Sequence, residues 1–211
     1  REKIEKENDE PHFIAFDIGP CGKLIEPLGD LSFENAVRLF KKSFLIALEG
    51  EIDLILIETM NDACEAKAAV IAAKEAMEEK GIEIPVFVTT VYDADGKSLT
   101  GSSPEIMVSI FESLGVTAVG MNCSLGPEQM AAIVPQLVEN ASIPGVVKPN
   151  AGLPRSENGR TVYDVSAQKF AEITSSFALQ GALILGGCCG TTPEHIRLLK
   201  ENVMNLERQQ K

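Results

Sequence analysis

The sequence alternates six times between a short apolar run and a longer amphipathic stretch, and this alternation limits the folds open to the chain. Runs rich in valine, isoleucine and phenylalanine predict β-strands at residues 13–18, 53–58, 86–91, 117–121, 145–148 and 182–185. Helical periodicity predicts α-helices at residues 33–48, 62–80, 104–114, 127–140, 166–180 and 193–208. Strands that are apolar on both faces and alternate with helices predict a parallel sheet built from βα units.

The carboxyl ends of the predicted strands distinguish between two parallel architectures. Each strand ends in polar or small residues, among them Asp17, Glu58, Asn122 and Cys188. Polar groups at every strand end favour the mouth of a (β/α)8 barrel over a doubly wound open sheet, and no Gly-x-Gly-x-x-Gly motif follows a strand. A complete barrel has eight units and needs about 250 residues. The sequence therefore predicts one TIM-type barrel domain, residues 1–211, that lacks two βα units.

Two adjacent cysteines, Cys188 and Cys189, follow the last predicted strand. Neighbouring side chains of a regular strand point to opposite faces, but glycines at positions 186, 187 and 190 allow the backbone to turn both thiols toward one point. Three interpretations are open: buried thiols without a role, a strained vicinal disulfide, or a metal site with a third ligand. The metal site is favoured, because parallel α/β folds place their chemistry where a strand leads into a helix.

Cys123 is the best candidate for a third ligand, because it ends another predicted strand and so lies at the same edge of the sheet. Three thiolates suit Zn²⁺, which prefers tetrahedral sulfur and nitrogen ligands, and they leave a fourth position for water or substrate. Cys21, in a loop, and Cys64, in a first helical turn, are weaker candidates. His195 lies at a helix N-terminus, where a capping or surface role is favoured over metal binding.

The charge of such a site indicates its chemistry. Three thiolates leave a Zn²⁺ site with a net negative charge, which makes the metal a poor Lewis acid for ionising water. A bound exogenous thiolate stays deprotonated and electron-rich there, so the predicted reaction is attack of a thiolate on an alkyl group. A rival interpretation treats Cys188 and Cys189 as a redox pair, and it predicts a reversible disulfide and no metal.

Composition excludes several other classes of function. The formal net charge is −12, from 31 acidic and 19 basic residues, which argues against binding to nucleic acid. No apolar run approaches the roughly 18–20 residues of a membrane span, and the charged first ten residues contain no signal region. Five irregularly spaced cysteines then predict a reducing, cytoplasmic location.

Four segments resemble one protein family. The run Gly-Gly-Cys-Cys-Gly-Thr-Thr-Pro-Glu-His-Ile at 186–196 resembles the zinc signature of homocysteine S-methyltransferases, and Met-Asn-Cys-Ser at 121–124 matches the upstream ligand motif of the family. Lys-Pro-Asn-Ala-Gly-Leu-Pro at 148–154 and Asp-Ile-Gly-Pro at 17–20 look most like the homocysteine-binding domain of cobalamin-dependent methionine synthases. The resemblance extends from about residue 11 to the C-terminus.

The resemblance implies a (β/α)8 barrel in which Cys123, Cys188 and Cys189 hold zinc. Homocysteine sulfur would take the fourth position and attack the methyl group of methylcobalamin, giving methionine, with the methyl group ultimately derived from methyltetrahydrofolate. Glu58 matches the strand-end glutamate that holds the amino group of the substrate. Asn122 and Asn150 are expected either to orient the substrate or the ligands, or to serve only in turns.

The resemblance also implies what has to be found elsewhere. The barrel of the family opens with two further βα units, which this sequence lacks, so a second chain that supplies them is a candidate partner. Corrinoid- and folate-binding regions are expected on other domains or chains. Two alternatives stay open: S-methylmethionine or betaine as the methyl donor, and a non-catalytic zinc-binding fragment that needs a partner chain.

Overall fold

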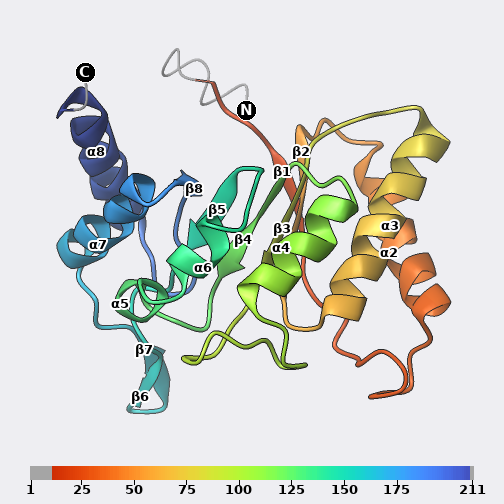
Figure 1. Ribbon diagram of the computed structural model, residues 1–211, viewed down its shortest axis with the longest axis horizontal. Coiled ribbons are helices and arrows are strands. Elements are labelled where there is room, and N and C mark those ends of the chain that lie inside the picture. Colours follow the sequence, from red (N-terminus) through yellow and green to blue (C-terminus); the bar gives the residue numbers. More distant parts are fainter. Residues whose placement is uncertain (1–10, 210–211) are drawn as a thin grey trace.

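The computed structural model describes residues 11–209, which form the predicted parallel sheet (Figure 1). Its six strands are hydrogen-bonded in the order β1-β2-β3-β4-β5-β8, and all neighbouring pairs are parallel. The strand bounds are β1 Ala15–Ile18, β2 Leu54–Met60, β3 Val86–Thr90, β4 Ala118–Asn122, β5 Gly145–Lys148 and β8 Ala182–Leu185. All six lie where the sequence predicts strands. Parallel pairing brings their carboxyl ends, and the polar residues there, to one edge of the sheet.

Helices follow the strands of this sheet. Their bounds are α2 Phe33–Ala47, α3 Ala63–Lys80, α4 Pro104–Ser113, α5 Pro127–Met130, α6 Val134–Val138, α7 Ala167–Leu179 and α8 Pro193–Gln209. The Ser32 side chain caps α2 by accepting from the Asn35 N–H, and the Asp62 side chain caps α3 through the Cys64 N–H. None of the helices within residues 11–209 is long and apolar enough to cross a lipid bilayer.

The prediction of one continuous helix over 127–140 was wrong. The segment forms two short helices, α5 and α6, and Pro135 lies in the first turn of the second. Proline has no N–H to donate to the preceding turn, and its ring clashes with the carbonyl four residues earlier. A helix that begins at Pro127 therefore ends before Pro135, and a new one starts with proline in its first turn.

A small hairpin was not predicted. Strands β6 (Arg155–Glu157) and β7 (Arg160–Val162) pair antiparallel, and Figure 1 shows them extending away from the main sheet. Asn158 and Gly159 connect them and both have positive φ, 51° and 74°. An Asn-Gly pair of this kind is the usual signal for a two-residue hairpin turn, so the sequence carried the information.

The described sheet is open, because β1 and β8 stand at the two ends of the hydrogen-bonding order. The core lies between the sheet and its helices, with Phe44, Phe111 and Phe177 fully buried. Large apolar side chains are exposed near both outer strands: Phe13 keeps 72% of its surface beside β1, and Leu183 keeps 72% on β8. The two open edges are thus apolar as well as unpaired.

Candidate metal centre

Cys123 is placed by a left-handed turn at the end of β4. Cys123 and Ser124 have φ values of 61° and 58°, which residues other than glycine and asparagine rarely adopt. The Cys123 N–H donates to the Lys148 carbonyl at 3.1 Å, so β5 holds this turn in position. The chain therefore leaves the strand direction at the residue whose thiol is needed at the sheet edge.

Cys188 and Cys189 are held by the loop that follows β5. The Cys188 N–H donates to the Pro149 carbonyl at 2.8 Å, and the Cys189 N–H donates to Asn150 Oδ1 at 3.0 Å. Gly190 continues the turn with φ 79°, and a Cβ there would lie 2.4 Å from Tyr163 Cγ. Asn150 thus supports the backbone of a candidate ligand, and the glycine after the cysteine pair is required by the close approach of a tyrosine ring.

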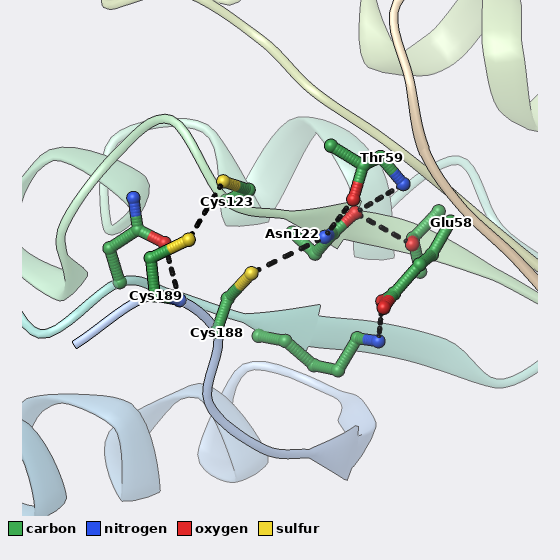
Figure 2. Close-up of polar contacts among 9 residues, drawn as sticks. Glu58, Thr59, Asn122, Cys123, Cys188 and Cys189 are labelled. Atoms are coloured by element: carbon green, nitrogen blue, oxygen red, sulfur yellow. Dashed lines mark hydrogen bonds and ion pairs between the residues drawn. The ribbon is translucent and has the colours of Figure 1, made fainter. Parts of the chain in front are cut away.

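The three sulfur atoms converge. They all lie within 4.8 Å of one another, and the Cys123 and Cys189 sulfurs are 3.8 Å apart. Figure 2 shows all three thiols turned toward a common point. Tetrahedral Zn²⁺ with Zn–S bonds of about 2.3 Å needs sulfurs about 3.8 Å apart, so the donor set fits this metal. Cys189 is exposed, which gives solvent and small molecules access to the group.

Hydrogen bonding between the thiols polarises them. The hydrogen bond from Cys188 lowers the pKa of the Cys123 thiol to about 5. The same interaction, together with burial, raises the pKa of Cys188. Of these two thiols, Cys123 is thus the one that ionises more readily. Soft metal ions bind cysteine as the thiolate, so a thiol that ionises readily favours their binding.

Asn122 connects the thiols to β2 and β3. It is completely buried, and its Nδ2 donates to Cys188 Sγ at 3.6 Å and to Thr59 Oγ1 at 2.8 Å. Its Oδ1 accepts from the Thr59 N–H at 2.9 Å and from Thr89 Oγ1 at 2.7 Å. The two acceptor bonds fix the amide so that its N–H groups face the sulfur (Figure 2). Asn122 therefore orients a candidate ligand.

Thr59 is a site residue that the sequence analysis missed. Its φ is 62°, an unusual value for a β-branched residue, and it lies where the register between β2 and β3 shifts. The irregularity turns both its N–H and its hydroxyl toward Asn122. A threonine in a strand carries no sequence signal for such a conformation.

The other predicted candidates lie outside this cluster. His195 Nδ1 accepts from the Thr192 backbone N–H at 3.2 Å, and Nε2 is 3.2 Å from the Val165 carbonyl. The predicted capping role is confirmed, whereas a surface position is wrong, because His195 keeps only 8% of its surface. Cys21 and Cys64 are exposed and belong to no metal-binding group among residues 11–209.

A charged cluster lies at the ends of β1, β2 and β5. Glu58 forms an ion pair with Lys148, and their side chains keep 20% and 16% of their surface. Asp17 shares a hydrogen bond with Glu58. The sequence pattern placed Asp17 and Glu58 at strand ends but did not pair either with Lys148, because nothing in a sequence tells that a lysine on β5 reaches an acid on β2.

Asp17 provides a test of this cluster by pH. Asp17 is exposed but partly desolvated, and this desolvation, followed by the negative charge of Glu58, raises the pKa of Asp17 from 3.8 to about 6. Because the folded state favours protonated Asp17, its ionisation lowers stability as the pH rises from about 4 to 6. Asp17→Asn is expected to raise the free energy of unfolding at pH 7 by up to about 1 kcal/mol, since Asp17 is solvent-exposed and screened.

The measurement is urea unfolding of both proteins between pH 4 and pH 8. The gain is expected to disappear below about pH 4, where Asp17 is protonated in both states. Asp95→Asn, in an exposed turn, is the control. A variant that is less stable than the parent at pH 7 would contradict this account of the cluster.

Fold and site together define an α/β protein of the TIM-barrel type with a three-thiol centre at its strand ends. The sequence model of the homocysteine S-methyltransferase family matches residues 1–203, and the chain belongs to that family.

Curated relatives and solved structures agree with this assignment. The chain is 36% identical over 190 residues to a methionine synthase from Mycobacterium leprae, which covers 90% of this chain and 16% of that protein. It is 35% identical over 201 residues to a methionine synthase from Mycobacterium tuberculosis, covering 95% of this chain and 17% of that protein. The chain therefore spans only a small part of the length of these relatives.

The fold has a solved counterpart. The homocysteine methyltransferase MmuM from Escherichia coli in its apo form superposes with a TM-score of 0.74 at 23% identity, covering 95% of this chain and 67% of that one. Its metallated form gives a TM-score of 0.70 at 24% identity, covering 95% and 65%. The six parallel strands are thus those of a TIM-type barrel, of which this chain forms the larger part.

Proposed function

We propose that this chain binds Zn²⁺ through Cys123, Cys188 and Cys189 and transfers a methyl group to homocysteine, giving methionine. The observation that carries the proposal is the convergence of three sulfurs from two strand ends within 4.8 Å of one another, with the Cys123 and Cys189 sulfurs at the 3.8 Å that tetrahedral zinc requires. Family membership supports the substrate. When bound, zinc supplies a positive centre that keeps a substrate thiol deprotonated at neutral pH.

The residues of the chain itself would position the reactants. Glu58 lies at a strand end beside the thiols and would receive the ammonium group of homocysteine. Asn122 would hold Cys188 through its N–H···S contact, and Asn150 would hold the backbone of Cys189. In the transfer, an S–CH₃ bond forms on the substrate and the methyl bond of the donor breaks, with its electron pair leaving on the donor.

The proposed donor is methylcobalamin, carried by another domain or chain. Its support is the similarity to methionine synthases, which are far longer than this chain and have room for corrinoid- and folate-binding domains. S-methylmethionine and betaine are the alternative donors. We also propose that residues 1–211 belong to one barrel domain, although residues 1–10 lie outside the described part, and that the protein is cytoplasmic, as its unpaired cysteines suggest.

The open edges of the sheet indicate that further βα units are needed to complete the barrel for this function. Phe13 and Leu183 are exposed near the open edges of β1 and β8, and an edge of that kind is normally paired or covered. We infer that two further βα units, from the same polypeptide or a partner chain, close the barrel between these strands. A non-catalytic zinc-binding fragment is the rival function.

A turnover assay distinguishes a methyltransferase from a non-catalytic zinc-binding fragment. Zinc-loaded chain, with the first two βα units of a family member fused before residue 1, is incubated with homocysteine and methylcobalamin, and methionine is quantified by mass spectrometry. We expect methionine from methylcobalamin and at least about tenfold less from S-methylmethionine or betaine, because specificity for a donor follows from contacts made in the transition state. A fused, zinc-loaded protein that is inert with all three donors would establish the non-catalytic function.

A further inference from the structure

Lys148 and Glu58 form an ion pair in which both side chains are largely buried. The ion pairs of Lys23 and Arg197 lie on the surface, with more than half of the basic side chain exposed. The Lys148 and Glu58 side chains keep only 16% and 20%. Removing two charges from water is costly unless both are paired, so Glu58 is held with a cation already beside it.

The pair bridges strands that are not neighbours. Glu58 is on β2 and Lys148 on β5, with β3 and β4 between them in the sheet. The Lys148 side chain therefore reaches past β3 and β4 to contact Glu58. The backbone of the same residue accepts from the Cys123 N–H.

The structure leaves room for this lysine side chain. A Cβ on Gly186 would lie 3.2 Å from Lys148 Cγ and 3.4 Å from Cδ. The glycine before the cysteine pair thus lets the aliphatic stem pass, while the flexible four-carbon stem leaves the ammonium group free to change partners. Asp17 adds a second acid beside Glu58, so a Glu58 without a cation would face another carboxyl group.

We propose that Lys148 makes the site specific for thiols that carry an α-amino acid group. In the free protein its ammonium group occupies the position on Glu58 that the proposed function gives to the ammonium group of homocysteine. An amino acid brings an ammonium and a carboxylate together, so the substrate ammonium pairs with Glu58 while Lys148 turns to the substrate carboxylate. This inference rests on the proposed function and adds the group that binds the substrate carboxylate.

Ligands with one of the two charges leave one protein charge without a partner. A thiol with an amine alone competes with Lys148 for Glu58 and leaves the lysine unpaired. A thiol with a carboxylate alone draws Lys148 away and leaves Glu58 facing Asp17. Both losses occur in a partly buried site, where an unpaired charge is costly. Lys148 thereby disfavours thiols that carry only the amine or only the carboxylate.

The test is calorimetric titration of the Co²⁺-loaded chain with homocysteine, 4-mercaptobutyrate and 3-mercaptopropylamine. In Lys148→Met we expect 4-mercaptobutyrate to bind at least about tenfold more weakly and 3-mercaptopropylamine at least about fivefold more tightly, because the carboxylate loses its partner and the amine loses its competitor. Lys148→Arg is expected to retain the preference for the carboxylate. Lys41→Met, which removes two ion pairs between α2 and α3, is the control and should change none of the affinities.

Opposite shifts for the two single-charge ligands would establish the proposal, whereas parallel shifts or none would overturn it. Circular dichroism checks that each variant is folded. If Lys148→Met unfolds, Lys148→Arg keeps the test decisive, because an equal loss of affinity for 4-mercaptobutyrate and 3-mercaptopropylamine in Lys148→Arg would also overturn the proposal. The visible spectrum of Co²⁺ reports thiol binding separately. A parent chain that binds metal and thiol without discriminating the charges contradicts only the role of Lys148, whereas one that binds neither contradicts the proposed function too.

Discussion

Replacing Cys123 with serine is expected to abolish stoichiometric zinc binding. The parent chain, purified under reducing conditions, should contain about one zinc per chain, and the variant should bind zinc at least about 100-fold more weakly, because a hydroxyl does not replace a thiolate as a zinc ligand. The same result is expected for Cys188→Ser and Cys189→Ser. The three sulfurs converge on one point, so the loss of any one leaves an incomplete donor set.

Zinc content by atomic emission and affinity by competition with a chromophoric chelator provide the two readouts. Cys21→Ser and Cys64→Ser are matched controls, because both thiols are exposed and lie outside the cluster. Full zinc content in Cys123→Ser would show that the metal is held elsewhere. Little zinc in a folded parent chain, with a disulfide that forms reversibly between Cys188 and Cys189, would favour the redox interpretation.

Replacing Asn122 with alanine is expected to lower both stability and metal affinity. The side chain is fully buried and makes four hydrogen bonds. Its truncation leaves the Thr59 N–H and the Thr89 hydroxyl without partners, which is expected to lower the free energy of unfolding by about 3 kcal/mol. Loss of the contact to Cys188 should weaken zinc binding by about 10- to 100-fold, as is usual for groups that orient a ligand.

Urea unfolding of the metal-free protein measures the first effect, and chelator competition measures the second. Asn140→Ala is the control, because Asn140 is exposed and donates one hydrogen bond to the Gln136 carbonyl. If zinc affinity in Asn122→Ala stays at the parent value while stability falls, Asn122 supports only the fold, and the ligand-orienting role is wrong.

The sequence predicted those features that depend on periodicity and on strand order. Six strands alternating with helices require a parallel sheet, and a parallel sheet brings Cys123 to the edge where Cys188 and Cys189 lie. These conclusions need no knowledge of individual contacts. Both conclusions were confirmed, because the common direction of the strands alone decides which strand ends lie at the same edge of the sheet.

Features that depend on individual contacts were not predictable. Thr59 adopts a conformation that its residue type disfavours, and it is held there by Asn122, 63 positions away. Lys148 reaches Glu58 across two intervening strands, 90 positions away. Periodicity tells which segments are strands and which are helices, but the reach of a long side chain depends on packing around its stem, here at Gly186.

The positions of the cysteines in the sequence have a consequence for the stability of the folded chain. Cys123 and Cys189 are 66 positions apart, so an ion bound by both closes a long loop that contains β5, the hairpin and α7. A covalent cross-link over a loop of that length is worth about 4 kcal/mol in chain entropy, and a tight metal bridge acts on the unfolded chain in the same way. The bound ion would thus act as a cross-link that stabilises the attachment of β8 and α8 to the rest of the sheet.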